Sequence, residues 1–140
     1  MPFVLDSSVA LAWLLPDESS ASADVVGDRL TYDIAVVPPV WPLEIGNVLL
    51  IALRRRRITR AELDEALLHV RDLPVKVDST ATGQALRDTF AMAEARGLTT
   101  YDASYLELAR RRGLPVATLD RGLREACVAA GIEVIPESDG

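Results

Sequence analysis

The chain has 140 residues, of which 49% are hydrophobic and 5% aromatic, and it contains a single cysteine. This length and apolar content suit a compact core of Val, Leu and Ala, and they exclude an intrinsically disordered chain. One cysteine excludes an internal disulfide framework and is typical of the reducing cytoplasm, while a formal net charge of −6 argues, taken alone, against a nucleic-acid partner.

The first fifteen residues, MPFVLDSSVALAWLL, are largely apolar but have no basic leader and carry Asp6 in their middle. This pattern predicts a strand followed by a helix of the fold, and not a signal peptide. No uninterrupted apolar run is long enough to cross a bilayer, so we expect no membrane association.

Short strands and helices are expected to alternate along the rest of the chain. Strands are predicted at 3–5, 34–37, 75–77, 115–119 and 132–135. Helices are predicted at 9–15, 19–30, around Glu44, after the capping box that begins at Thr59, at 80–96, from Asp102 to Gly113, and from Asp120 to Gly131. This alternation predicts an α/β fold in three layers, a central parallel sheet flanked by helices on both faces, with residues 1–140 as a single domain.

Glu44 is a charged residue inside the apolar segment 40–53 (VWPLEIGNVLLIAL), in which only one other side chain is polar. At helical spacing it shares a face with Trp41, Val48 and Ala52. An unpaired carboxylate on such a face is costly. The sequence therefore predicts that Glu44 either becomes neutral or lies next to a cation.

Three aspartates occupy positions that suggest one shared site. Asp6 and Asp120 each follow a predicted strand, and Asp102 opens a predicted helix. Because ligands of open α/β sheets bind at the carboxyl ends of the strands, we expect all three to meet Glu44 at one edge of the sheet. Each aspartate taken singly is also a favoured helix N-cap, but capping leaves Glu44 unexplained.

Four carboxylates in one cleft repel one another unless a cation neutralises them. Hard divalent ions prefer oxygen ligands, and no histidine or cysteine lies near these positions in the sequence, so Mg²⁺ or Mn²⁺ is expected and zinc is not. The sequence has neither a Walker loop nor a GxGxxG motif, which favours phosphodiester hydrolysis over nucleotide-dependent phosphoryl transfer.

Four segments of the chain resemble the PIN domain, specifically the VapC-type ribonuclease toxins of type II toxin–antitoxin systems. They are VLDSSVALAWLLPDE, PLEIGNVLL, TTYDASYLELARRRGLPVATLD and GIEVI, which together span most of the chain in the family's order. The resemblance implies a three-layer α/β fold and endonucleolytic cleavage of RNA that depends on Mg²⁺ or Mn²⁺. It also implies inhibition by a cognate antitoxin protein, and a homodimer or a toxin–antitoxin hetero-oligomer in the cytoplasm.

The four acids match the acidic quartet of this family, which implies that they bind the metal and carry catalysis. Asp6 and Asp102 would be the principal ligands, and the other two would complete the site directly or through water. The resemblance also assigns supporting hydroxyl groups to Ser8, shortly after the first aspartate, and to Thr118, two residues before the last.

Two arginine-rich blocks interrupt the acidic composition. One comprises 54–57 with Arg60, and the other comprises 110–112 with Arg121 and Arg124. We expect both to lie at helix C-termini, where cations complement the helix dipole. A role in guiding the RNA phosphate backbone is the alternative.

Five other residues are expected to be structural rather than catalytic. We expect His69 to be solvated, Cys127 to lie in the core, and Trp13 and Trp41 to pack or to form an interface. Asn47 would either hydrogen-bond the nearby glutamate or cap a buried backbone group. The apolar first helix offers a candidate dimer surface.

Two other classes of protein compete with the nuclease. A non-catalytic PIN-like binding module would use the acidic crevice to dock a basic partner peptide, but it has little reason to keep four repelling acids. A phosphotransfer receiver domain would need adjacent acids after the first strand and a late lysine. Here Asp6 is followed by two serines and lysine is nearly absent. The sequence therefore favours the ribonuclease.

Overall fold

A computed structural model of the protein describes residues 1–79 and 82–137. Within these residues, a five-stranded parallel sheet has the order β3-β2-β1-β4-β5. The strands are β1 (Phe3–Leu5), β2 (Ala35–Val37), β3 (Val75–Val77), β4 (Val116–Ala117) and β5 (Val134–Ile135). The central strand β1 pairs Phe3 with Ala35 on one side and Val4 with Val116 on the other.

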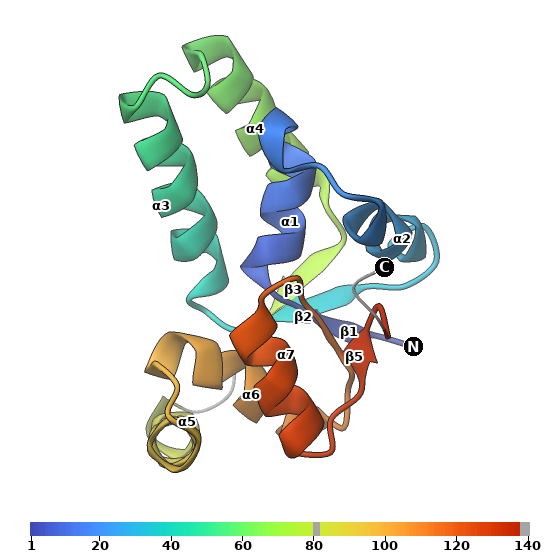
Figure 1. Ribbon diagram of the computed structural model, residues 1–140, viewed down its shortest axis with the longest axis vertical. Helices are drawn as coiled ribbons and strands as arrows, with labels where there is room; N and C mark the ends of the chain where they lie inside the picture. The colour runs from blue at the N-terminus through green and yellow to red at the C-terminus, as the bar shows by residue number, and fades with distance from the viewer. Residues whose placement is uncertain (80–81, 138–140) are drawn as a thin grey trace.

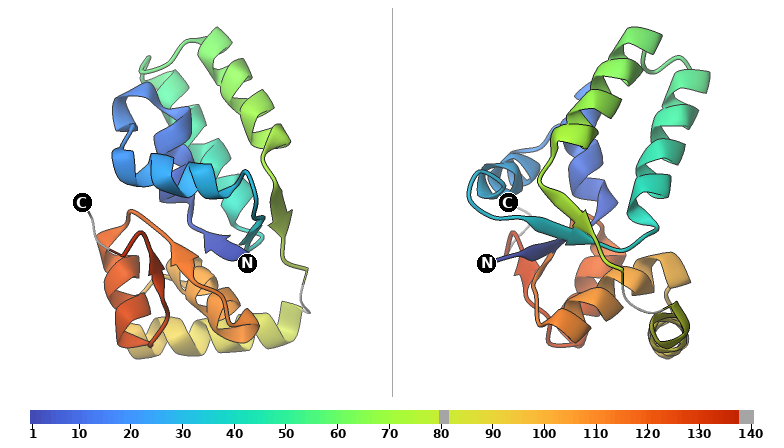
Figure 2. Two further views of the ribbon diagram at one scale, coloured as in Figure 1. Left: turned by 90° about the vertical axis from the view of Figure 1, so that its right-hand side faces the viewer. Right: turned by 180° about the vertical axis from the view of Figure 1, so that it is seen from behind.

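The helices cover both faces of the sheet, as Figures 1 and 2 show. They are α1 (Ser7–Leu14), α2 (Ala21–Arg29), α3 (Trp41–Arg54), α4 (Arg60–Asp72), α5 (Thr82–Arg96), α6 (Thr100–Arg112) and α7 (Arg121–Ala129), with a 3₁₀ turn at Pro16–Glu18. Helices α1 to α4 lie on one side, where α3 and α4 form a hairpin that projects away from the sheet. Helices α6 and α7 lie on the other side, with α5 packed outside α6. The expected three-layer α/β fold is confirmed.

Most predicted elements are present, with differences at their ends. The strand expected at 115–119 is reduced to Val116–Ala117, because the chain leaves the sheet before the loop that carries Thr118 and Asp120. The strand expected at 132–135 ends as predicted but begins only at Val134. Helix α1 begins at Ser7, directly after Asp6, two residues earlier than expected. The expected start of α5 at Thr80 lies outside the described residues.

The core is formed by the sheet and by the inner faces of the helices. All three residues of β1 are fully buried, and so is Cys127, as expected. The segment 9–12 of α1 is buried in this same core, so the interpretation of α1 as a dimer surface is wrong. Trp41 is also buried, and Trp13 donates a hydrogen bond from Nε1 to the carbonyl oxygen of Ala23 at 2.7 Å, which makes both packing residues.

Helix ends follow the expected local signals. Thr59 and Glu62 form the predicted capping box at the start of α4. Gly113 ends α6 with φ +66°, a left-handed conformation that favours glycine because it has no Cβ. His69 is exposed on α4, in agreement with the prediction of a solvated position. No helix in the described part of the chain is long and apolar enough to cross a membrane.

The arginine blocks only partly follow the expected placement. Arg54 ends α3, and residues 110–112 form the last turn of α6, both as predicted. Arg57 contacts Asp17 at 2.9 Å, so it ties the end of α3 to the 3₁₀ turn. Arg121 and Arg124 lie instead in the first half of α7, so the expectation of a helix C-terminus is wrong for these two.

Candidate metal and active site

Asp6 is a buried carboxylate at the carboxyl end of the central strand. Its side chain accepts hydrogen bonds at Oδ2 from Ser8 Oγ (2.6 Å) and from Thr118 Oγ1 (2.8 Å). The two hydroxyl groups accept in turn from backbone amides, those of Leu119 (3.0 Å) and Asp120 (2.9 Å) respectively. The network joins the loop after β1 to the loop after β4. Ser8 and Thr118 thus contact the first aspartate, where the resemblance placed their hydroxyl groups.

The environment of Asp6 disfavours its charge. Burial raises the pKa of the Asp6 carboxyl above its usual range, and repulsion from Asp120 raises it further. The hydrogen bonds from Ser8 and Thr118 oppose this rise without cancelling it. The Asp6 carboxylate is therefore held in place by its hydrogen bonds, which offset only part of the cost of burying its charge.

The capping hypothesis has a different outcome for each aspartate. Asp120 does cap α7, since its Oδ2 accepts from the backbone amide of Leu123 at 2.8 Å. Asp6 precedes α1 but its side chain makes no cap hydrogen bond to that helix. The expectation that Asp102 opens its helix is wrong, because Thr99 is the N-cap of α6 and accepts from the Asp102 amide. The Asp102 carboxylate is thus not used for capping.

Glu44 lies beside the buried stripe of α3 rather than within it. That stripe consists of Trp41, Ile45, Leu49 and Ala52. Glu44 and Val48 are half-buried at its edge, so the predicted shared face is only partly correct. The edge position leaves the carboxylate open on the side that faces the other acids.

Tyr105 is the hydrogen-bond donor to Glu44. Its ring is fully buried in α6, and its hydroxyl group donates a short hydrogen bond to Glu44 Oε1. The partner of Glu44 is thus Tyr105 and not Asn47, whose side chain is exposed. Burial raises the pKa of the Tyr105 hydroxyl, so it stays protonated and acts as a donor.

The four predicted acids lie within electrostatic reach of one another. Burial raises the pKa of Glu44, and the charges of Asp6 and Asp102 raise it further. Burial likewise raises the pKa of Asp102, with added repulsion from Asp120 and Asp6. The structure therefore brings together one acid that directly follows β1 and one acid each from α3, α6 and the β4–α7 loop in one electronegative region.

This region matches a hard divalent cation in its donor chemistry. All four acids offer carboxylate oxygens, the ligands that Mg²⁺ and Mn²⁺ prefer. In residues 1–79 and 82–137, no three His, Cys, Asp or Glu side chains are close enough together to form a ready-made metal cluster. The expected meeting of the four acids is therefore present only as electrostatic proximity, and among the described residues they do not form a closed ligand set.

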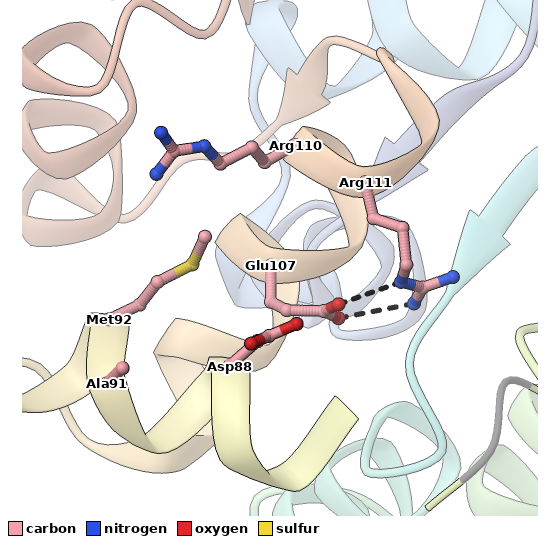
Figure 3. Close-up of a pocket in the computed structure, with 6 residues that line it drawn as sticks. All are labelled: Asp88, Ala91, Met92, Glu107, Arg110 and Arg111. Atoms are coloured by element: carbon pink, nitrogen blue, oxygen red, sulfur yellow. Dashed lines mark hydrogen bonds and ion pairs between the residues drawn. The ribbon is translucent and has the colours of Figure 1, made fainter. Parts of the chain in front are cut away.

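A further acidic residue of α6 takes no part in this region. Glu107 is buried and pairs with Arg111, whose Nε lies 2.7 Å from Glu107 Oε1. Figure 3 shows this pair beside a cavity that Asp88 and Met92 of α5 also line. Arg111 Nη2 also contacts Asp78 Oδ2 at 2.7 Å, just after β3. These ion pairs fasten α6 to the edge of the sheet and have a structural role.

Sequence reasoning missed two residues that contact the site. Tyr105 stands three positions after Asp102, so the two share one face of α6, and that spacing is the signal that predicts its nearness to the acids. Arg124 donates to the carbonyl oxygens of Thr118 (3.1 Å) and Pro136 (2.8 Å), which links the β4–α7 loop to the C-terminal segment. No local pattern signals this second contact.

Comparison with known proteins identifies the family. The family model described as PIN domain matches residues 3–129, and Ribonuclease VapC3 from Pyrobaculum aerophilum is 33% identical over 131 residues, covering 89% of this chain and 94% of that protein. The chain therefore belongs to the PIN domain family. The predicted resemblance to VapC-type proteins is confirmed.

Solved structures agree with this assignment. PAE2754 from Pyrobaculum aerophilum has a TM-score of 0.67 and 27% identity, with 90% of this chain and 87% of that chain covered. VapBC2 from Rickettsia felis, solved bound to a promoter DNA fragment, has a TM-score of 0.67 at 9% identity and covers 96% and 97%. FitAcB from Neisseria gonorrhoeae has a TM-score of 0.66 at 16% identity and covers 98% of each chain. The last two show that the fold is shared.

Tyr105→Phe tests the Tyr105–Glu44 hydrogen bond. Removing the hydroxyl leaves a half-buried carboxylate without its donor, and we expect the free energy of unfolding to fall by about 1–2 kcal/mol. Thermal or urea unfolding at neutral pH measures this loss. Tyr32→Phe, at a position that is 76% exposed, is the matched control and should change little. Equal stability of both variants and the wild type would contradict the assignment.

Asp102→Asn tests the repulsion among the acids. A carboxyl whose pKa is raised in the folded state stabilises the fold below its unfolded pKa of about 3.9, and this contribution is lost as the pH rises through the folded pKa. In EDTA, the Tm of Asp102→Asn should therefore exceed that of the wild type by an amount that grows between pH 4 and pH 7. Asp64→Asn, exposed on α4, is the control. A Tm difference that does not change with pH would refute the electrostatic explanation.

Proposed function

We propose that this protein is a metal-dependent endoribonuclease that hydrolyses RNA phosphodiester bonds, and that it is the toxin component of a type II toxin–antitoxin pair. The observation that carries the proposal is the grouping of half-buried and buried acids in a PIN domain: burial raises the pKa of Asp6, Glu44 and Asp102, and the charge of at least one neighbouring acid raises each further. Acids grouped in this way form a region of negative potential that attracts cations. The similarity to Ribonuclease VapC3 supports the choice of RNA.

In this proposal the chain's own residues hold the site in shape. Asp6, Glu44, Asp102 and Asp120 would bind one or two Mg²⁺ or Mn²⁺ ions, and the cation would supply Lewis acidity to the phosphate. Ser8 and Thr118 fix the Asp6 carboxylate by donating to one of its oxygens. Tyr105 fixes Glu44 in the same way from the opposite layer of the fold.

Other parts of the proposal follow from the family. We infer that a cognate antitoxin protein binds the chain, either as a hetero-oligomer or on a homodimer, and that the protein acts in the cytoplasm. The α3–α4 hairpin supports a protein partner, because Leu50, Ile51, Leu67 and Leu68 all expose large apolar side chains there.

Glu44→Gln and Asp102→Asn test the nuclease site. Each keeps the shape of the side chain and removes its charge, so we expect Mg²⁺- or Mn²⁺-dependent RNA cleavage to fall by roughly 100-fold or more. Gel analysis of a single-stranded RNA measures this loss. Added Mg²⁺ or Mn²⁺ should also raise the Tm of the wild type more than that of either variant. Wild-type cleavage by both variants would refute the proposed site and favour a non-catalytic binding module.

The exposed arginines 54–56 test the RNA-guiding hypothesis. They lie at the far end of α3, about 15 Å along the helix from Glu44, within reach of an RNA strand. Replacing all three by Gln should weaken RNA binding and flatten its dependence on salt, measured by fluorescence anisotropy between 50 and about 200 mM salt. Arg57 is kept because it pairs with Asp17. The double variant Arg87→Gln and Arg96→Gln, on α5, is the control, and equal salt slopes would contradict the role.

A further inference from the structure

A cavity of about 450 Å³ opens beside Glu44, between the first turns of α3 and the start of α6. Val40, Leu43, Glu44 and Asn47 line it from α3, and Ser7 and Tyr101 line it from α1 and α6. The cavity adjoins the acidic region, because Glu44 lines the cavity and also interacts electrostatically with Asp6 and Asp102.

Two large side chains of the cavity are not covered by the fold. Tyr101 is 61% exposed and Leu43 is 74% exposed. They line the cavity from α6 and α3 respectively, and each leaves apolar surface open to water. The Asn47 amide, one helical turn from Glu44, is exposed in the same cavity and offers both a donor and an acceptor.

The charge of the cavity excludes a phosphate as its occupant. None of the described residues that line it is basic, and Glu44 contributes a carboxyl group. A neutral, flat group with an aromatic face and a polar edge matches Tyr101, Leu43 and Asn47 together. In a single-stranded RNA that group is an unpaired nucleobase, which proteins bind by stacking on aromatic rings and by hydrogen bonds to its edge.

We propose that this cavity binds one nucleobase of the RNA next to the scissile phosphate, with the base stacked on Tyr101 and its edge contacted by Asn47. This inference rests on the proposed ribonuclease function. It assigns substrate positioning and base preference to two residues outside the four acids. Tyr101 lies one residue from Asp102, so stacking fixes the base at a constant distance from the reacting phosphate.

Tyr101→Ala, combined with RNA that lacks one base, tests the proposal. Fluorescence anisotropy would measure the binding of single-stranded RNA to Asp102→Asn, the variant expected to cleave RNA far more slowly, with and without Tyr101→Ala. Loss of one stacking contact should weaken binding about 5- to 150-fold, and Tyr101→Phe should restore it. Placing an abasic nucleotide at each position in turn should identify one position at which Tyr101→Ala no longer has an effect.

Controls separate this site from its alternatives. Tyr32→Ala, on an exposed tyrosine that does not line the cavity, should bind RNA as its parent does. Asn47→Ala should change the order of preference among the four bases at the position that the abasic series identifies. Unchanged binding by Tyr101→Ala would overturn the proposal, as would an equal loss with every abasic RNA. A change of oligomeric state in size-exclusion chromatography, without a change in RNA binding, would overturn it in favour of an interface between two copies.

The nuclease activity is tested separately with the wild-type protein. If the wild type cleaves RNA with Mg²⁺ or Mn²⁺ and Tyr101→Ala binds RNA normally, the base site is wrong and the ribonuclease assignment stands. If the wild type cleaves no RNA, the proposed function is wrong whatever the result with Tyr101→Ala.

Discussion

The site depends on one buried carboxylate, whose oxygen accepts hydrogen bonds from two hydroxyl groups. Asp6 Oδ2 accepts from Ser8, in the first turn of α1, and from Thr118, in the loop after the neighbouring strand β4. The same hydroxyl groups accept from the amides of the β4–α7 loop, so the carboxylate, the loop and the start of α7 are fixed together. Because Asp6 directly follows the central strand β1, it lies at the middle of the sheet edge, and the other acids lie around it.

The remaining acids are arranged around this centre at decreasing depth. Asp6 is buried, Glu44 and Asp102 are half-buried, and Asp120 is exposed. Burial raises the pKa of the first three, and the raised values express the cost of assembling negative charge away from water. Structural hydrogen bonds from hydroxyl groups offset only part of that cost. Acids whose charges are only partly offset form a region of negative potential, which attracts cations.

Local sequence patterns predicted the role of some side chains correctly and the role of others wrongly, and the helix caps show why. The alternation of apolar runs and stop signals predicted the strands and helices of the parallel sheet, because apolar runs and stop signals both depend on residues that are close in the chain. The capping rule suited all three aspartates equally, yet only Asp120 caps its helix. Thr99 takes the cap of α6, so Asp102 is left for the acidic region. Because Thr99 caps α6, the helix begins before Asp102, and the Asp102 side chain lies in the first turn instead of at the cap.

The sequence by itself determined the fold class and the family, because strand and helix periodicity and the order of motifs can be read along the chain. It also singled out four acids, whose joint role in a site stays a prediction. Only the tertiary structure decided which side chain donates a hydrogen bond to the Glu44 carboxylate. The donor, Tyr105, is 61 residues away in the chain and contacts Glu44 from a helix on the other face of the sheet. The same holds for the link between Asp6 and Thr118, 112 residues apart. Burial, hydrogen-bond partners and mutual repulsion depend on distances in space, which packing sets and which no sequence spacing encodes.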